Sequence, residues 1–359
     1  MGGGPAGLAA AIAARRCGIS VTLADPARPG EDKACGEGVL PEGVEALRRL
    51  GIRFPAPEVW PFRGIRFLGR EVTAEARFSH GYGLAIRRTV LHALLAEHAE
   101  ASGVRLLWNT PVVEISSRGA MLRDRFVSAR WIVGADGGRS RVRRWMRRDP
   151  RRPSAFRYAV RRHYRVRPWS DFVEVHWSDD AQFYVSRIAE QEVCVVLISR
   201  RKGARIEQAL ADFPVLAGRL AAAHPSTAAR GSLTASLRLS RVSRGPVALA
   251  GDASGSVDAI TGQGLTLAFL QAEALAAAIS TGNLARYEAE HRRIMRRPMF
   301  ISRLLLSLDG RPRLRRRVLR ILAEKPHLFA RLLAIHAGAA SAAQSVVGGL
   351  HLGWSLIAS

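Results

Sequence analysis

The alternation of apolar and polar positions predicts a chain in which helices and strands take turns. Residues 8–14 form an alanine-rich apolar run that predicts a helix, and residues 19–24 predict a short buried strand closed by Asp25. Leucines near one face predict an amphipathic helix over residues 89–102, and residues 264–280 predict another helix. Further short apolar runs predict strands at residues 104–108, 112–115, 131–135 and 247–250.

The middle of the chain changes character. Valine and aromatic residues dominate predicted strands at residues 172–177, 182–188 and 193–199, which favours an antiparallel sheet in a second unit. Residues 206–223 and the chain after residue 285 read as helical. The first 25 residues contain a turn, a helix, a strand and an acidic residue in that order, which is the order found in a dinucleotide-binding unit. The predicted fold class is therefore α/β, Rossmann-like, with an inserted antiparallel sheet and a helical C-terminus.

Composition narrows the class of protein. The chain has 359 residues, of which 48% are hydrophobic, which excludes a disordered or fibrous protein and predicts two or three structural units. No run of about 18 apolar residues predicts a membrane span. The cysteines Cys17, Cys35 and Cys194 form no Cys-x-x-Cys pair, which argues against a disulfide scaffold or a structural zinc site. Since no signal-peptide pattern opens the sequence, a reducing, cytoplasmic location is the expectation.

The formal net charge of +25 comes mostly from arginine. A GC-rich genome accounts for such an excess as well as a binding surface does, but a basic surface attracts phosphorylated cofactors and anionic lipid headgroups. Residues 139–152 are dense in arginine without interleaved stacking aromatics, so nucleic acid is not an expected partner. Residues 311–322 predict a basic amphipathic helix, which either covers a core with its solvated face outward or docks peripherally on an anionic membrane.

Candidate chemistry begins with the fingerprint Gly2-x-Gly4-x-x-Gly7. Gly2 permits a tight turn, Gly4 lets the backbone approach a pyrophosphate, and Gly7 lets the helix pack close to the sheet. Asp25 ends the next strand, where an acid accepts hydrogen bonds from a ribose diol. A structural glycine loop and a solvated turn aspartate are the alternatives, because either motif alone occurs often by chance.

Two later junctions repeat this arrangement of buried strand, glycine and acid. Asp136 follows one predicted strand and precedes two glycines, and Gly251 with Asp252 follows another. Gly262 and Gly264 then open the predicted helix that starts at residue 264. Three such junctions in this order are hard to obtain by chance, so together they favour a dinucleotide site.

With these motifs the chain resembles the FAD-dependent oxidoreductases of the p-hydroxybenzoate hydroxylase and geranylgeranyl reductase superfamily, over roughly residues 1–285. The resemblance implies FAD as cofactor, with NADPH or another reductant as transient electron donor. It implies that Gly2, Gly4 and Gly7 hold the FAD diphosphate and that Asp25 binds the adenosine ribose. The remaining implied contacts are Arg88 with the flavin nucleotide, Val112 with the adenine, Asp136 with the cofactor, Gly251 and Asp252 with the ribityl chain, and Gly262 and Gly264 with the isoalloxazine ring.

Residues 33–38 and 251–258 look more like the geranylgeranyl reductase branch than the aromatic hydroxylases. That likeness implies reduction of a C=C bond in an apolar small molecule by hydride transfer from flavin N5. Cys35 is the candidate proton donor or redox thiol, against the alternative of a small loop residue. Two other functions stay open. One is an NAD(P)H-dependent FAD monooxygenase of a phenolic or polyketide-like substrate, and the other is a basic membrane-surface-binding protein with a vestigial flavin fold.

A lipophilic or aromatic small molecule is the expected substrate. Aromatic residues of the predicted second unit either line its pocket or belong to a plain core. They are Trp60, Phe62, Phe67, Trp177, Phe183 and Tyr184.

The predicted FAD-binding domain is discontinuous. It comprises residues 1–55, 84–155 and 240–285, with residues 56–83 and 156–239 as the substrate domain and residues 286–359 as a helical C-terminal region. A dinucleotide-binding fold normally has a buried strand before its first glycine, whereas only Met1 precedes it here. The expectation is a gene start upstream of Met1.

Overall fold

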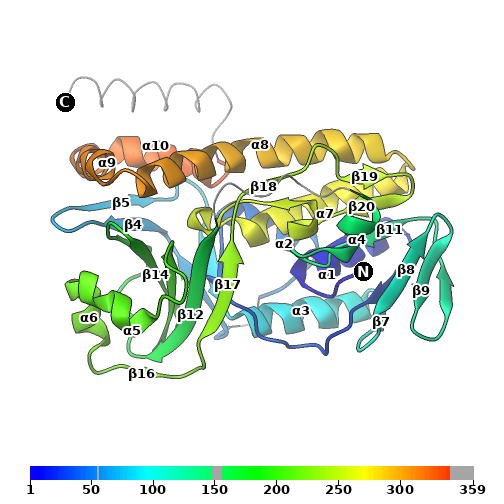
Figure 1. The fold of residues 1–359 in the computed structure, drawn as a ribbon, viewed down its shortest axis with the longest axis horizontal. Helices are drawn as coiled ribbons and strands as arrows, with labels where there is room; N and C mark the ends of the chain where they lie inside the picture. The colour runs from blue at the N-terminus through cyan, green and yellow to red at the C-terminus, as the bar shows by residue number, and fades with distance from the viewer. Residues whose placement is uncertain (55, 148–155, 340–359) are drawn as a thin grey trace.

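A computed structural model of the chain describes residues 1–54, 56–147 and 156–339. Two halves that contain β-strands lie side by side, and a layer of long helices runs over both of them (Figure 1). The helices of this layer are α8 (Leu284–Asp309), α9 (Pro312–Glu324) and α10 (Pro326–His336). Residues 148–152 of the predicted arginine-rich segment and residues 340–359 of the predicted helical region lie outside the described residues.

Apolar helices build the core of the first half. α1 (Pro5–Arg16) starts with proline, which suits the first helical position because no partner exists there for an amide hydrogen. Its small residues are buried, which lets it pack closely against α3 (Arg88–Ala101) and α7 (Gly264–Ser280). The observed α7 has the bounds that the sequence predicts.

Parallel pairs of short strands lie on either side of the N-terminus. They are β1 (Thr22–Ala24) with β7 (Arg105–Leu107) and β11 (Ile132–Gly134) with β20 (Val247–Leu249). The first two residues connect these pairs: the Gly2 amide donates to the Ala24 carbonyl at 2.9 Å, and the Ala135 amide donates to the Met1 carbonyl at 2.8 Å. The carboxyl ends of the strands therefore meet at the glycine loop.

An eight-stranded sheet forms the second half. Its strands are β4 (Gly64–Leu68), β5 (Thr73–Arg77), β12 (Arg157–Arg165), β13 (Val173–Trp177), β14 (Ala181–Ala189), β15 (Glu192–Ser199), β16 (His224–Pro225) and β17 (Arg230–Thr234). The strand order is β16-β12-β15-β14-β13-β4-β5, and β17 also pairs with β12. β13 and β4 run parallel, whereas the other neighbours run antiparallel.

Smaller elements complete the two halves. They are β2 (Gly38–Val39), β3 (Val59–Phe62), β6 (Gly83–Ile86), β8 (Val112–Ser116), β9 (Gly119–Leu122), β10 (Phe126–Ser128), β18 (Leu237–Arg238), β19 (Ser243–Arg244), β21 (Gly255–Ser256), α2 (Pro41–Arg49) and α4 (Arg141–Trp145). The predicted helix 206–223 is split into α5 (Ile206–Ala209) and α6 (Pro214–Leu220), because Pro214 lacks the amide hydrogen that a continuous helix needs.

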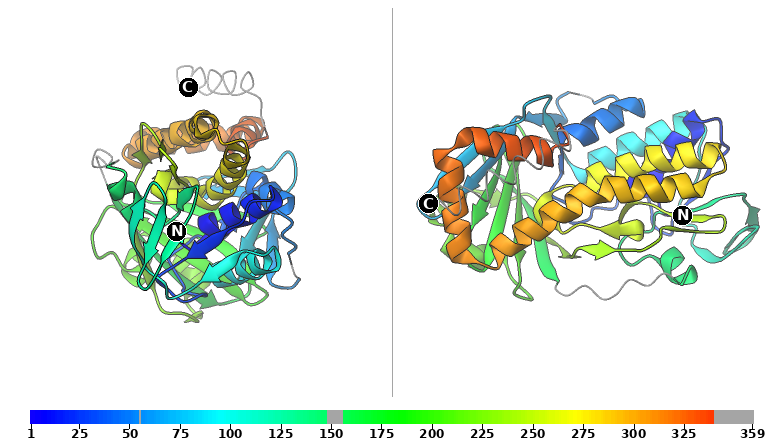
Figure 2. Two further views of the ribbon diagram at one scale, coloured as in Figure 1. Left: turned by 90° about the vertical axis from the view of Figure 1, so that its right-hand side faces the viewer. Right: turned by 90° about the horizontal axis from the view of Figure 1, so that it is seen from above.

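Each of the long helices α8, α9 and α10 has one side buried against the rest of the protein. α8 runs along the molecule, and α9 and α10 fold back over the sheet (Figure 2). The apolar side of α9 packs with Ala74 and Ala76 of β5 and with α10, so the basic helix predicted at residues 311–322 covers a core. Among the described residues, every helix is too short or too polar to cross a bilayer. The predicted α/β class, with its antiparallel sheet and helical C-terminal region, is confirmed.

Candidate cofactor and substrate site

A cavity of about 2480 Å³ is lined by residues of both halves and of the helices α8–α10. Ligand pockets commonly measure roughly 300–1,000 Å³, so this space exceeds the needs of one drug-sized molecule. The part here called the glycine–acid end comprises Gly2, Gly4, Asp25, Arg88, Val112, Asp136, Gly251, Asp252, Gly262 and Gly264. The part here called the apolar end comprises Phe67, Val175, Trp177, Leu319, Phe329 and Leu333.

The glycine loop has the conformation that its sequence predicts. Gly2 has a φ of +102°, and a Cβ there would lie 2.3 Å from the Ala135 carbonyl oxygen. A Cβ on Gly7 would lie 1.8 Å from the Gly2 carbonyl oxygen, so a side chain at either position would displace backbone. Gly4 caps α1 and lines the cavity, with no side chain on the first amides of the helix. A helix N-terminus left open in this way favours an anion.

Asp25 follows β1 and lines the cavity beside the glycine loop. Its two carboxylate oxygens accept hydrogen bonds from the Gly3 amide at 2.5 Å and the Ala27 amide at 2.7 Å. Each oxygen can accept a second hydrogen bond, so the carboxylate is held in place and still has capacity for a diol. Val112, at the start of β8, lies in the wall of the same cavity.

Asp252 stands on a tight turn after β20. The turn is fixed by the Gly251 amide, which donates to Gln271 Oε1 at 2.8 Å, and Gly251 has a φ of +59°. The Asp252 carboxylate is surrounded by protein yet open to the cavity, and it has no hydrogen-bond partner within the part of the chain that the structure describes. Burial raises the pKa of Asp252, while the Arg88 and Arg143 guanidinium groups oppose the rise.

Arg88 is the first residue of α3, where the helix dipole disfavours a cation. Its Nε atom is buried and has no hydrogen-bond partner among the described residues. Cys35 lines the cavity close by: burial raises the pKa of its thiol, and the Arg88 guanidinium opposes that rise. An anion in the cavity beside the Arg88 guanidinium would offset the unfavourable interaction of this cation with the helix dipole.

Asp136 has a different environment from the other two acids. Its carboxylate accepts hydrogen bonds from the Ser140 hydroxyl at 2.5 Å, the Arg141 amide at 2.6 Å and the Val142 amide at 3.2 Å. The side chain thus holds the first turn of α4, although the residue lines the cavity. Its direct contact with a cofactor stays a prediction.

Gly262 and Gly264 lie where α7 begins. Gly262 has a φ of +62°, and a Cβ on either glycine would meet no atom within 4 Å because both face the cavity. α7 starts without a side-chain cap, so its first amides are open to a ligand on this side.

A buried pair that the sequence did not reveal lies behind Cys35. Glu37 is in the left-handed region with a φ of +56°, a conformation that costs a non-glycine residue about 1–3 kcal/mol. One of its carboxylate oxygens accepts the Arg88 amide at 3.0 Å, and the other is hydrogen-bonded to His163 Nε2 at 2.6 Å. These bonds anchor the loop that carries Cys35. No local signal marks the pair, because the two residues are 126 positions apart.

The same pair lies beside Cys194, and the potential ligand atoms of Glu37, His163 and Cys194 lie within 4.8 Å of one another. The Arg161 guanidinium is 3.5 Å from His163 Nδ1. A divalent cation would be repelled by that charge, so the cluster is better described as a hydrogen-bonded support for the loop than as a metal centre.

The aromatic candidates divide between cavity and core. Phe62, Phe67, Trp177 and Tyr184 line the cavity. Trp60 instead packs under the Arg187 guanidinium, 3.6 Å from its ring centre, and Phe183 is fully buried in the sheet core. Tyr184 donates a hydrogen bond at 3.0 Å to the Ile260 carbonyl, which joins the sheet to the turn before Gly262.

The glycine–acid end fits FAD. The open N-terminus of α1 suits a diphosphate, and Asp25 has the free acceptor capacity that a ribose diol requires. Within the described residues the Asp252 carboxylate has no hydrogen-bond partner and is open to hydroxyl groups, and the Arg88 guanidinium in the same wall attracts an anion. The structure therefore brings the predicted residues to one cavity wall, with the exception of Gly7, which lies behind it.

Comparison with known proteins agrees with this fit. The family described as FAD binding domain matches residues 1–297. The menaquinone reductase of Mycobacterium tuberculosis is 34% identical over 184 residues, which cover 47% of this chain and 45% of that protein. The rifampicin monooxygenase of Streptomyces venezuelae is 29% identical over 158 residues, which cover 40% of this chain and 32% of that protein. The chain thus spans less than half the length of these curated relatives.

Among solved structures, a flavoprotein/dehydrogenase from Cytophaga hutchinsonii has a TM-score of 0.81 and 20% sequence identity, covering 94% of this chain and 91% of that one. Identity at this level shows the fold alone. The family match extends from the glycine loop into α8, so the resemblance stated from the motifs is confirmed. The chain belongs to the FAD-binding-domain family.

Proposed function

We propose that this chain is an FAD-dependent oxidoreductase that reduces a C=C bond of an elongated, lipophilic substrate. The observation that carries the proposal is the continuity of the cavity, in which the Asp252 carboxylate and the Arg88 guanidinium share one space with an apolar wall. A cofactor and an apolar molecule can therefore meet without an intervening layer of protein. The name of the menaquinone reductase relative also fits a lipophilic, isoprenoid-type substrate for this chain.

FAD, when bound and first reduced by an electron donor such as NADPH, would supply the hydride for such a reduction. The apolar end excludes water and orients the substrate. Cys35 holds the proton: burial raises the pKa of its thiol, so the group is protonated at neutral pH. The Glu37 amide donates to Cys35 Sγ at 3.3 Å and would stabilise the thiolate that remains after the proton leaves.

A second candidate is a monooxygenase, which the rifampicin monooxygenase relative favours. It would use the same cofactor end and the same water-excluding wall, with O₂ as co-substrate. The two reactions differ in the atom that the product gains, so product analysis separates them.

The test uses the purified full chain loaded with FAD. The protein is reduced without oxygen, by NADPH in one arm and by dithionite in the other, and is then mixed with menaquinone or with a lipid that carries a geranylgeranyl chain. We expect a product that gains two hydrogens and keeps them in air. Cys35→Ser should slow product formation by about 10²- to 10⁴-fold, the usual contribution of a general acid, with FAD content unchanged.

Cys17→Ser serves as the control, since Cys17 is exposed on the far end of α1. A product that gains oxygen, and only when air is admitted, would identify the monooxygenase instead. If neither reductant yields any product, the result would favour the third function, a membrane-surface-binding protein with a vestigial flavin fold.

A further inference from the structure

The cavity reaches the protein surface at α8, and we propose that this opening docks on an anionic lipid bilayer. The docking surface comprises Arg296, Phe300, Arg303 and Leu304. The inference rests on the proposed function in one respect, because a lipophilic substrate dissolves in a bilayer. The evidence for docking and its experimental test do not depend on measuring the proposed reduction.

The apolar part of the docking surface continues the cavity wall outward. Phe300 is 67% exposed, the largest exposed fraction among the large apolar side chains that the structure describes, and Leu304 is 39% exposed. Both residues also line the cavity. They are four positions apart on one helix and therefore share a face. An apolar molecule that leaves a bilayer at this face would reach the apolar end without crossing water.

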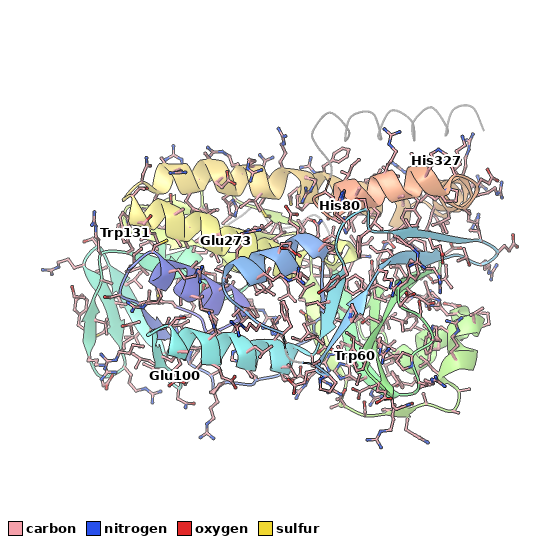
Figure 3. All side chains as sticks on the ribbon, turned by 180° about the vertical axis from the view of Figure 1, so that it is seen from behind. Trp60, His80, Glu100, Trp131, Glu273 and His327 are labelled. Atoms are coloured by element: carbon pink, nitrogen blue, oxygen red, sulfur yellow. The ribbon has the colours of Figure 1, made fainter. Side chains whose placement is uncertain are left out.

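Two arginines flank this apolar pair. Arg296 lies one turn before Phe300, and Arg303 lies nearly one turn after it, both exposed. Within the described residues neither forms an ion pair, whereas their neighbours Arg292 and Arg293 pair with acids of α8 itself. Figure 3 shows nitrogen-tipped side chains projecting outward along α8. Positive charge without a counter-ion around an exposed aromatic ring is complementary to anionic headgroups over an acyl layer.

The proposed docking surface lies on α8, whereas the sequence pattern alone points to α9 as the membrane-docking helix. α9 has the stronger basic amphipathic pattern, but its apolar residues Val318, Ile321 and Leu322 are buried in the core. Arg315 of α9 is also buried, and it pairs with Asp179 at 2.6 Å. α9 therefore has no apolar side left for a bilayer, whereas α8 has one at the cavity opening.

A second copy of the chain is the other occupant to consider. In a symmetric dimer built on this face, the same arginines would meet their own copies or each other across the axis. Such like-charge contacts disfavour self-association, while a surface of anionic lipid neutralises them. The charge pattern thus favours the bilayer.

The test is co-sedimentation of the FAD-loaded full chain with phosphatidylcholine vesicles, with and without phosphatidylglycerol, at low and moderate salt. The wild-type chain should pellet with the anionic vesicles alone, and less at the higher salt. The double variant Phe300→Gln, Arg303→Gln should partition at least about tenfold more weakly.

The matched control is Arg123→Gln, Phe126→Gln. It removes the same charge and a phenylalanine that is 47% exposed on β10, away from the cavity wall. We expect the control to pellet like the wild-type chain. FAD absorbance, measured on every variant, should be unchanged, which separates the docking surface from the proposed chemistry.

Three results would overturn the proposal. One is equal pelleting with neutral and anionic vesicles, or none with either. Another is an equal loss of binding in the control and the docking variant, which would reduce the effect to net charge. The third is a wild-type dimer in analytical ultracentrifugation that Phe300→Gln dissociates. Vesicle binding that persists in a protein without reductase activity would instead count against the proposed function and leave the docking surface intact.

Discussion

The two ends of the cavity are built by different means. The glycine–acid end is shaped by backbone, through left-handed glycines, helix N-termini and carboxylates that accept amide hydrogen bonds. The apolar end is shaped by side chains that α9 and α10 pack onto the sheet. Backbone shape requires one residue type at a fixed position, whereas an apolar wall requires only volume. Adding a side-chain atom at the glycine–acid end should therefore strongly reduce FAD binding and stability, whereas the apolar end should tolerate the exchange of one apolar residue for another.

The largest effect is expected from Gly7→Ala. The new Cβ would overlap the Gly2 carbonyl oxygen, 1.8 Å away, so the glycine loop must shift and FAD binding should be lost. The overpacking should also lower the free energy of unfolding by about 1–3 kcal/mol. FAD content after purification and urea unfolding measure the two effects.

Gly218→Ala is the matched control for that change. Gly218 is also helical, and a Cβ there would meet no atom within 4 Å. It should keep full FAD and gain about 0.5–1 kcal/mol of stability from helix propensity. Full FAD retention in Gly7→Ala would contradict the distinction between the two ends.

Acid should loosen the glycine–acid end. His291 is hydrogen-bonded to the Ser254 hydroxyl at 2.9 Å, and that hydroxyl donates to the Gly251 carbonyl at 2.8 Å. Burial lowers the pKa of His291 from 6.5 to about 4. Below pH 6.5 the unfolded chain binds the proton more readily than the folded chain. Stability should therefore fall progressively until about pH 4, by about 3 kcal/mol, and be independent of this group above pH 6.5.

Urea unfolding of His291→Gln at about pH 7 and about pH 4 measures that contribution, which the variant should lack. His336 lines the cavity, and burial lowers its pKa to about 4 as well. His336→Gln should flatten the pH dependence in the same direction while the protein keeps its FAD. An unchanged pH slope in His291→Gln would show that the buried histidine does not support the turn.

The smallest of these effects is expected at the apolar end, from Phe329→Leu. The Phe329 ring stacks on Phe67 with ring centres 4.9 Å apart and lines the cavity. Leucine keeps an apolar wall, so stability should fall by less than about 1.5 kcal/mol. The KM for a lipophilic substrate should rise by up to about tenfold, with FAD affinity unchanged. A loss of FAD in this variant would mean that the two ends are not independent.

The sequence predicts that the residues of the glycine–acid end lie together, for the same physical reason. A tight turn and a close backbone approach need glycine, and a strand end that faces a diol needs an acid. Gly2, Gly4 and the Gly251–Asp252 pair can therefore be identified from the sequence alone. α7 can be predicted as well, because the apolar pattern of a long helix indicates the helix whatever element it packs against.

β12 is the clearest element that the sequence could not predict. Its buried positions hold Arg157, Arg161 and His163, so the strand shows no apolar alternation. Each of these groups is paired with an acid more than 100 positions away in the chain. Such compensation is visible only in three dimensions. α9 is the converse case, because an amphipathic pattern does not say whether the apolar face meets a membrane or a sheet.

The Asp252 carboxylate faces the cavity, where we propose that it binds FAD. The most direct test is a calorimetric titration of FAD into the apo form of the wild-type chain, of Asp252→Ala and of the exposed control Asp212→Ala. We expect the FAD dissociation constant to rise between about fivefold and about 150-fold in Asp252→Ala, because a hydrogen-bond acceptor is lost, and to stay unchanged in the control. Equal affinities for the wild-type chain and Asp252→Ala would contradict the proposal.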